Sequence, residues 1–216
     1  MKKKSLNAKK IIHKYLINKL KNKKINKIYN HFEKNLNLKL KNGNLAGSIS
    51  GGPDSLALAY FLKCYSLKHK KKIYYYHVDH KLRKNSHSEA SKLKIVLSKN
   101  DINCEILSWI GKKPKSNIQS LARKKRYQLI DKNINKNNVR YILTAHHYDD
   151  LKENFFIRMT RGSGLEGLVS FNSSDNRYSE KLSILRPLIN VKKSDLDYTS
   201  KKVFNFAIND PSNHNE

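Results

Sequence analysis

The stretch LAGSISGGPDSLALAYFLKCY, residues 45–65, decides how this 216-residue chain folds. Its first part, Leu45 to Ser50, is apolar and predicts a strand, and its last part, from about Ser55 to Tyr65, predicts an apolar helix. A glycine-rich turn joins the two. Backbone N–H groups at such a turn, together with the dipole of the following helix, form an anion site. The stretch therefore predicts a phosphate-binding loop at the end of a strand.

The turn itself carries the chemistry that a phosphate site needs. Its glycines let the backbone approach phosphate closely, and its serine hydroxyls can add donors. Its carboxylate would repel a bare phosphate, so we expect a Mg²⁺ ion between the two. There is no GKS or GKT ending, which excludes a Walker-type loop. An ordinary glycine turn is the alternative, but a chance match has odds on the order of one in several thousand. The candidate phosphate-binding residues are Ser50, Gly51, Gly52, Pro53, Asp54 and Ser55.

Strand and helix patterns alternate along the rest of the chain. This alternation predicts an α/β fold: a doubly wound, mostly parallel sheet of about five strands with helices on both faces and an added N-terminal helix. We expect residues 1–40 to form a helical extension and residues 41–216 a catalytic domain. The part from about 165 to 216 would be a small helical and loop appendage. Strand patterns cover 73–78, 104–109, 141–144 and 183–186, and helix patterns cover 5–38, 88–99, 119–130, 149–161 and 193–205.

Composition points to a polyanionic partner, although weakly. The formal net charge is +28, which favours nucleic acid, yet a chain rich in Lys, Asn and Ile is also what an AT-rich genome would impose. Arginines are more informative, because their planar fork grips phosphate or carboxylate. No apolar run approaches the roughly 20 residues that span a bilayer, and no secretory signal is evident. We expect a cytoplasmic protein that makes no use of a membrane.

Five further segments carry polar side chains in recognisable order. In the third of them, His146, Asp150 and Glu153 have the spacing i, i+4 and i+7, which predicts one helix face at the carboxyl end of a strand. There Asp150 and Glu153 could hold Mg²⁺ with Asp54, while His146 donates to or steadies a phosphate. Such a carboxylate pair alone is more often a solvated helix N-terminus. The segments are VDHKLR (78–83), NIQSLARKKRY (117–127), AHHYDDLKE (145–153), LRPL (185–188) and NDPSN (209–213).

The SGGPDS turn resembles the signature of the PP-loop ATP pyrophosphatases. Together with the five segments it resembles, from residue 45 to 213, the N-type tRNA(Ile)-lysidine synthetases, whose fold is HUP-like. The resemblance implies a ligase that uses ATP and Mg²⁺ to adenylate the C2 oxygen of the wobble cytidine in isoleucine tRNA with a CAU anticodon. The ε-amine of L-lysine then attacks C2, forming lysidine with release of pyrophosphate and AMP.

The resemblance also implies roles for individual residues. Asp54, Arg126, His146, Asp150 and Glu153 would be catalytic, with the three carboxylates as metal ligands. Residues 162–167 would cover the site or contact RNA, and His80, His147 and Asp79 rank lower, as structural residues. The residues expected to bind tRNA weakly are Arg83, Arg123 and Arg161.

This chain departs from the family pattern in two places. Leu151 and Asn154 stand where the family usually has Gln and Thr, which leaves the spacing of the carboxylates and His unchanged. The chain also stops at Glu216, where the family continues into an Arg-containing helical region. We therefore expect it to bind ATP–Mg²⁺ but to bind tRNA weakly.

Three alternatives stand beside this interpretation. A thiolase-type PP-loop tRNA modifier needs cysteines for an iron–sulfur cluster, and the two isolated residues Cys64 and Cys104 do not supply them. A small-molecule synthetase would leave the HHxDDxxE and DPSN segments unexplained. A basic RNA-binding module without catalysis is disfavoured by Asp54, Asp150 and Glu153, because carboxylates weaken phosphate binding.

Overall fold

A six-stranded sheet in the order β3-β2-β1-β4-β6-β5 lies at the centre of the computed structural model, which describes residues 2–114, 116–134, 137–162, 176–179 and 182–208. Five neighbouring strands run parallel, which confirms the predicted fold class, and β5 pairs antiparallel with β6 at the edge. The strands are β1 (Asn44–Ser48), β2 (Ile73–Asp79), β3 (Cys104–Ser108), β4 (Val139–Leu143), β5 (Asn176–Ser179) and β6 (Leu182–Leu185).

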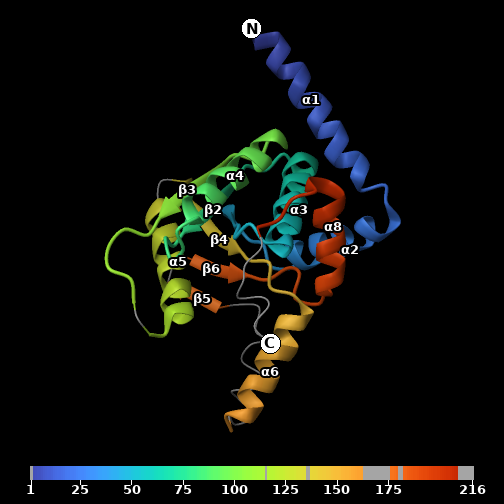
Figure 1. Ribbon diagram of the computed structural model, residues 1–216. Helices are drawn as coiled ribbons and strands as arrows, with labels where there is room; N and C mark the ends of the chain where they lie inside the picture. The colour runs from blue at the N-terminus through green and yellow to red at the C-terminus, as the bar shows by residue number, and fades with distance from the viewer. Residues whose placement is uncertain (1, 115, 135–136, 163–175, 180–181, 209–216) are drawn as a thin grey trace.

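Helices cover both faces of this sheet, as predicted (Figure 1). Side chains alternate along each strand, so that Leu45 packs with α3, α4 and α8 in one core cluster while the next residue, Ala46, packs with α5 in the other. The helices are α1 (Lys2–Lys19), α2 (Lys23–Asn37), α3 (Pro53–His69), α4 (Ser86–Lys99), α5 (Ile118–Ile134), α6 (Tyr148–Thr160) and α8 (Lys193–Phe204).

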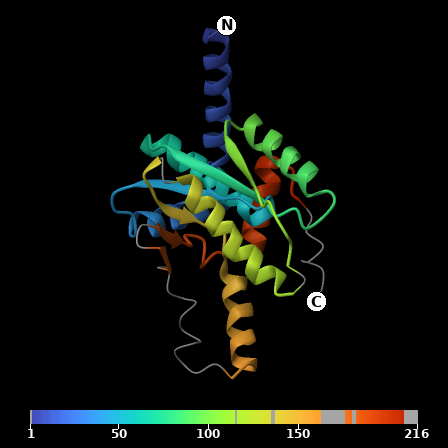
Figure 2. The same cartoon turned by 90° about the vertical axis from the view of Figure 1, so that its left-hand side faces the viewer.

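The single N-terminal helix expected over residues 5–38 is wrong, because the chain forms two helices there. Asn22 interrupts the first and caps the second: its side-chain oxygen accepts from the backbone N–H groups of Lys24 and Ile25, both at 3.1 Å. Helix α2 packs into the core through five buried side chains, whereas α1 reaches the core only near its end, with Leu16, and its N-terminal part projects from the body (Figures 1 and 2). The buried residues of α2 are Ile25, Ile28, Tyr29, Phe32 and Leu36. The division at residue 40 remains a prediction.

Helix α6 projects in the direction opposite to α1 (Figures 1 and 2). No residue of α6 is buried, and large apolar side chains such as Phe156 and Met159 are about half exposed, at 56% and 50%. Only the first turn of this helix takes part in the site described below. Most of the 162–167 loop and the whole 209–213 segment lie outside the described residues. Among the described helices, none is long and apolar enough to cross a membrane.

Candidate functional site

The predicted phosphate loop, residues 50–55, lies where β1 ends and α3 begins, at the carboxyl edge of the parallel strands. Helix α3 starts at Pro53, which suits the first helical position because its missing N–H would have no partner there. Ser55 stabilises the loop from within: its hydroxyl donates to the Gly52 carbonyl and accepts from the Gly51 N–H, both at 2.9 Å. Ser50 is exposed beside the loop, and the amides at the start of α3 form the kind of helix N-terminus that binds anions.

Gly51 is required by geometry. Its φ of +97° is a conformation that residues with a side chain rarely adopt, and a Cβ there would lie 2.4 Å from Cδ1 of Ile208. The Ile208 N–H also donates to the Gly51 carbonyl at 3.0 Å. The segment after α8 therefore packs against the loop and fixes its backbone through this hydrogen bond.

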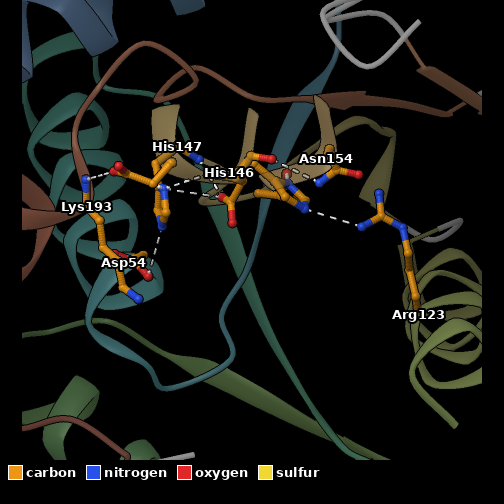
Figure 3. A network of polar contacts seen from close by, with 9 residues as sticks. Asp54, Arg123, His146, His147, Asn154 and Lys193 are labelled. Carbon is orange, nitrogen blue, oxygen red and sulfur yellow. Dashed lines mark hydrogen bonds and ion pairs between the residues drawn. The ribbon is translucent and has the colours of Figure 1, made fainter. Parts of the chain in front are cut away.

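His147 joins the phosphate loop to the start of α6. Its Nε2 lies 3.6 Å from Oδ2 of Asp54, and its Nδ1 lies 3.5 Å from Oδ2 of Asp150 (Figure 3). It also begins the helix, because its backbone N–H donates to Asp150 Oδ2 at 2.7 Å and its ring Nδ1 accepts from the Asp150 N–H. Burial disfavours its protonation, but the carboxylates of Asp54 and Asp150 outweigh burial and raise its pKa. This residue, ranked low from sequence, is a central contact of the site.

The carboxylates of Asp54 and Asp150 fit a phosphate-bound Mg²⁺ ion. Oδ1 of Asp54 is buried and has no hydrogen-bond partner among the described residues. Burial raises the pKa of Asp150, and the nearby charges of Asp54 and Glu153 add to that effect. Within the described ranges, no group of three or more acidic, His or Cys side chains is arranged to hold a metal by itself. Mg²⁺ is usually held by one or two carboxylates plus substrate phosphates, so this pair suits it.

The expected common helix face of His146, Asp150 and Glu153 is wrong. Helix α6 begins at Tyr148, because the cap formed by His147 and Asp150 fixes its start, and His146 therefore precedes the helix. Glu153 lies one turn further along α6 and is exposed. Its assignment as a third metal ligand remains a prediction.

His146 faces the cationic side of the site. Its Nδ1 lies 2.7 Å from Oγ1 of Thr144, and Nη1 of Arg123 lies 3.3 Å from its Nε2 (Figure 3). A guanidinium can only donate, so Nε2 accepts and Nδ1 carries the proton. Burial and then the charges of Arg123, Arg186 and Arg126 lower the pKa of His146 to about 3. The imidazole is thus neutral, and the geometry favours the steadying role over proton donation.

Arg126 and Arg123 come from the same face of α5. Burial lowers the pKa of Arg126, with Arg123 acting in the same direction, and the arginine has no ion-pair partner among the described residues. Excess positive charge at the carboxyl edge of a sheet suits a polyphosphate. Of the three arginines expected to contact tRNA, Arg123 belongs to this site, Arg83 pairs with Glu89 at 3.1 Å, and Arg161 caps the far end of α6.

Several residues of the site were missed from sequence. Oδ2 of Asp149 accepts from the Lys193 N–H at 2.8 Å, which ties α6 to the start of α8. Arg186 of the LRPL segment is only 2% exposed and acts electrostatically on His146. Arg186 carried a usable signal, since a lone arginine at the end of a buried strand needs an anionic or polar partner. Lys193 carried none, because its backbone makes the contact.

Comparison with known proteins identifies the family. The family model for the PP-loop domain, ATP_bind_3, matches residues 18–216. Proteins named tRNA(Ile)-lysidine synthase are 40% identical over 174 residues in Orientia tsutsugamushi, covering 81% of this chain and 39% of the relative, and 36% identical over 178 residues in Wolbachia pipientis wMel, covering 80% and 40%. The chain spans about two-fifths of the length of these curated relatives.

Solved structures agree on the fold. The U34-tRNA thiolase NcsA of Methanococcus maripaludis, solved with its [4Fe-4S] cluster, superposes with a TM-score of 0.67 at 16% identity, covering 85% of this chain and 64% of that one. The NH3-dependent NAD synthetase of Campylobacter jejuni superposes with a TM-score of 0.50 at 14% identity, covering 85% and 73%. Sequence identities this low support a shared fold and nothing more. The family model covers most of the chain, and the glycine-rich loop of this chain lies at the carboxyl edge of a parallel sheet. The chain therefore belongs to the PP-loop domain family.

Proposed function

We propose that this chain carries the catalytic site of a tRNA(Ile)-lysidine synthetase. ATP would adenylate the C2 oxygen of the wobble cytidine in isoleucine tRNA with a CAU anticodon, and L-lysine would then replace AMP at C2. The observation that carries the proposal is the contact of His147 with both Asp54 and Asp150, because it joins the phosphate loop to the HHxDDxxE segment. The names of the relatives at 34–40% identity support the substrate.

In the first step, the C2 oxygen attacks the α-phosphorus of ATP, and the bond to the bridging oxygen breaks to release pyrophosphate. The α3 amides and the Ser50 hydroxyl would bind phosphate oxygens at the loop. Arg123, held by His146, and Arg126 would stabilise the negative charge that grows at phosphorus. In the second step the lysine ε-amine attacks C2, loses a proton, and the C2–O bond breaks to release AMP.

Asp54 and Asp150 would hold the Mg²⁺ ion, which would neutralise negative charge on the phosphates. His147 lies against both carboxylates and would keep them at a fixed separation before the ion binds. The site would act mainly by positioning the reactants and by stabilising charge. ATP and tRNA meet in the cytoplasm, where we propose that the protein acts.

A thiolase-type reaction is the second candidate, since the superposed thiolase has the same fold. The cysteines of this chain do not favour it. Cys64 and Cys104 both lie in the buried core cluster, and burial raises the pKa of each thiol to about 12. Cluster ligands must be deprotonated thiolates, which these buried thiols resist.

The test is incorporation of labelled lysine into an isoleucine tRNA transcript with a CAU anticodon, in the presence of ATP and Mg²⁺ at low salt. We expect lysine to enter the RNA with equal amounts of AMP and pyrophosphate released. A transcript with uridine at the wobble position is the matched control and should gain no label. ATP consumption without RNA would instead indicate a small-molecule synthetase, and RNA binding without ATP consumption would indicate a binding module.

A further inference from the structure

A concave surface lies along α5, the helix at the front of the molecule in Figure 2. It is a pocket of about 710 Å³, within the range of roughly 300–1,000 Å³ that small-ligand sites occupy. The loop after β3 and one face of α5 form its walls. The lining residues are Trp109, Lys112, Lys113, Pro114, Leu121, Lys124, Lys125 and Gln128.

The pocket is separate from the ATP site because α5 presents two different faces. Leu121, Lys124, Lys125 and Gln128 follow the i, i+3, i+4, i+7 spacing of one face. Arg123, whose guanidinium reaches His146, lies on the opposite face. The helix therefore serves the candidate active site with its arginines and the pocket with its lysines.

The indole ring of Trp109 positions two lysine ammonium groups of the pocket. Nζ of Lys113 lies 4.3 Å from the centre of the Trp109 ring and donates to the Trp109 carbonyl at 2.6 Å. Nζ of Lys125 lies 6.0 Å from the same ring. Cation–π contacts of this kind hold an ammonium group in place without neutralising it. The ring is only 8% exposed, so the apolar floor of the pocket consists of its edge together with Pro114 and Leu121, which is 40% exposed, under a positively charged rim.

The charges of the pocket lysines are not paired within the described part of the chain, although Asp79 acts on Lys113 without forming an ion pair. None of Lys112, Lys113, Lys124 and Lys125 forms an ion pair with a carboxylate in the part of the chain that the structure describes. Desolvation and then the charges of Lys81 and Lys125 lower the pKa of Lys113, against the opposing effect of Asp79. Mutual repulsion of ammonium groups is relieved when a polyanion binds. The pocket thus combines phosphate attraction with an apolar, aromatic surface.

His80 connects this pocket to the candidate active site. Its ring meets Trp109 edge-on, with 5.9 Å between the ring centres. Both of its ring nitrogens are buried and have no hydrogen-bond partner among the described residues. Burial and then the charge of Arg126 lower its pKa to about 4, so the imidazole is neutral. A ligand that packs against Trp109 would therefore lie near a ring that is affected by the charge of Arg126.

We propose that the Trp109 pocket binds an unpaired RNA nucleotide next to the one that is modified. The base packs on Leu121, Pro114 and the exposed edge of Trp109, and the flanking phosphates contact the lysines. Single-stranded nucleic acid is bound by this combination of a positive groove and aromatic surfaces. The identification of the polyanion as RNA rests on the proposed function. The pocket itself rests on the geometry.

The test uses the fact that Trp109 is the sole tryptophan of the chain. Its fluorescence is titrated with the anticodon stem-loop of isoleucine tRNA, with an RNA duplex that lacks unpaired nucleotides, and with inorganic polyphosphate. We expect the stem-loop to change the emission at concentrations at least about tenfold lower than the duplex or polyphosphate. An equal response to polyphosphate would reduce the pocket to an anion patch and overturn the proposal. A response to anionic phospholipid vesicles but not to the stem-loop would likewise overturn it.

A pair of variants with equal charge completes the test. Replacing Lys113 and Lys125 with Ala should weaken stem-loop binding by at least about tenfold. It should also lower the slope of log affinity against log salt by about 0.7 for each lysine removed. The control replaces Lys92 and Lys99 with Ala, since both are exposed on α4, which packs on the other face of the sheet. The control should bind with nearly wild-type affinity.

Lysine incorporation measured on the same proteins separates the two proposals. If the emission responds and the pocket variant binds weakly while no lysine is incorporated, the proposed reaction fails and the RNA pocket stands. If lysine is incorporated but the pocket variant binds RNA like the wild type, the reaction stands and the pocket proposal is overturned.

Discussion

Replacing Gly51 with Ala tests whether the loop after β1 is the phosphate site. The change places a side chain on a residue with a φ of +97° and puts its Cβ 2.4 Å from Cδ1 and 3.0 Å from Cγ1 of Ile208. A flexible side-chain end could give way, but the Ile208 backbone is held by its hydrogen bond to Gly51. The strain is therefore expected to reach the backbone of the loop.

The magnitude follows from the backbone conformation. Holding a residue other than glycine in a disfavoured φ region costs about 1–3 kcal/mol. If the loop keeps its shape, this cost lowers stability, and the Tm of a domain of this size falls by about 2–4 °C for each kcal/mol. If the loop relaxes instead, the cost appears in ligand binding, where each ~1.4 kcal/mol weakens affinity tenfold. We expect ATP–Mg²⁺ affinity to fall by about 10- to 100-fold, or the Tm to fall by several degrees.

Calorimetric titration with a non-hydrolysable ATP analogue and Mg²⁺, together with thermal unfolding, measures both quantities. Gly52→Ala is the matched control for stability, because its φ is −70° and the nearest atom to an added Cβ is Oγ of Ser50 at 3.8 Å. Adding Ile208→Ala to Gly51→Ala should recover part of the loss, since it removes the clash but not the strain. Wild-type affinity and wild-type Tm in Gly51→Ala would refute this account of the loop.

Asp54→Ala should abolish ATP-dependent adenylation of tRNA while the circular dichroism stays that of the wild type; unchanged adenylation would remove Asp54 from the mechanism. Asp150→Ala should raise the Mg²⁺ requirement and lower turnover by roughly a hundredfold, and a wild-type Mg²⁺ dependence would leave Asp150 with helix capping only. His146→Gln should reduce the fall in the free energy of unfolding between pH 6.5 and pH 4, measured by urea unfolding. The wild-type histidine has a pKa of about 3 in the folded protein, so over this range only the unfolded chain binds a proton there, which favours unfolding. An unchanged pH dependence in the variant would contradict the neutral imidazole. The 216-residue chain should bind isoleucine and methionine tRNAs similarly and with a steep salt dependence in filter binding, since lysines attract phosphate without reading bases, whereas a strong preference for the isoleucine species near physiological salt would contradict this.

The parts of the fold that could be predicted are those encoded by neighbouring residues. Residues 45–65 place strand, turn and helix in one continuous stretch, and the structure confirms that order. The N-terminal helices were predicted as one because residues 20–24 contain no Gly or Pro. Only the side chain of Asn22 marks the break, through its two bonds to the next turn. A capping residue in a polar helix is easily read as one more solvated position.

The sequence led us to expect Asp54 and Asp150 at one Mg²⁺ ion, but the contact of His147 with Asp54 was beyond prediction from the sequence alone. Asp54 and His147 lie on α3 and before α6, and nothing local records that β1 and β4 are neighbours in the sheet. The helix pattern of 149–161 starts within one residue of α6, but the position of His146 relative to that helix was misjudged. His147 accepts a helical N–H through a ring nitrogen, a role that Ser, Thr, Asp or Asn usually fills. The i, i+4, i+7 spacing therefore counted His146 as part of the helix, although it lies just before the capping residue.

The two adjacent histidines lie in opposite electrostatic environments. His147 faces the carboxylates of Asp54 and Asp150, which raise its pKa, whereas His146 faces arginines, which help to lower its pKa to about 3. A single peptide bond separates these opposite environments, because the backbone turns into α6 between the two rings. A phosphate chain that reaches from the loop toward α5 would pass from the carboxylate side to the guanidinium side. On the carboxylate side the phosphates need a metal cation to offset the negative charge of Asp54 and Asp150. On the guanidinium side the arginines already supply positive charge. Charge developing at phosphorus is therefore best stabilised on the side of Arg123 and Arg126, which is also the side next to the Trp109 pocket.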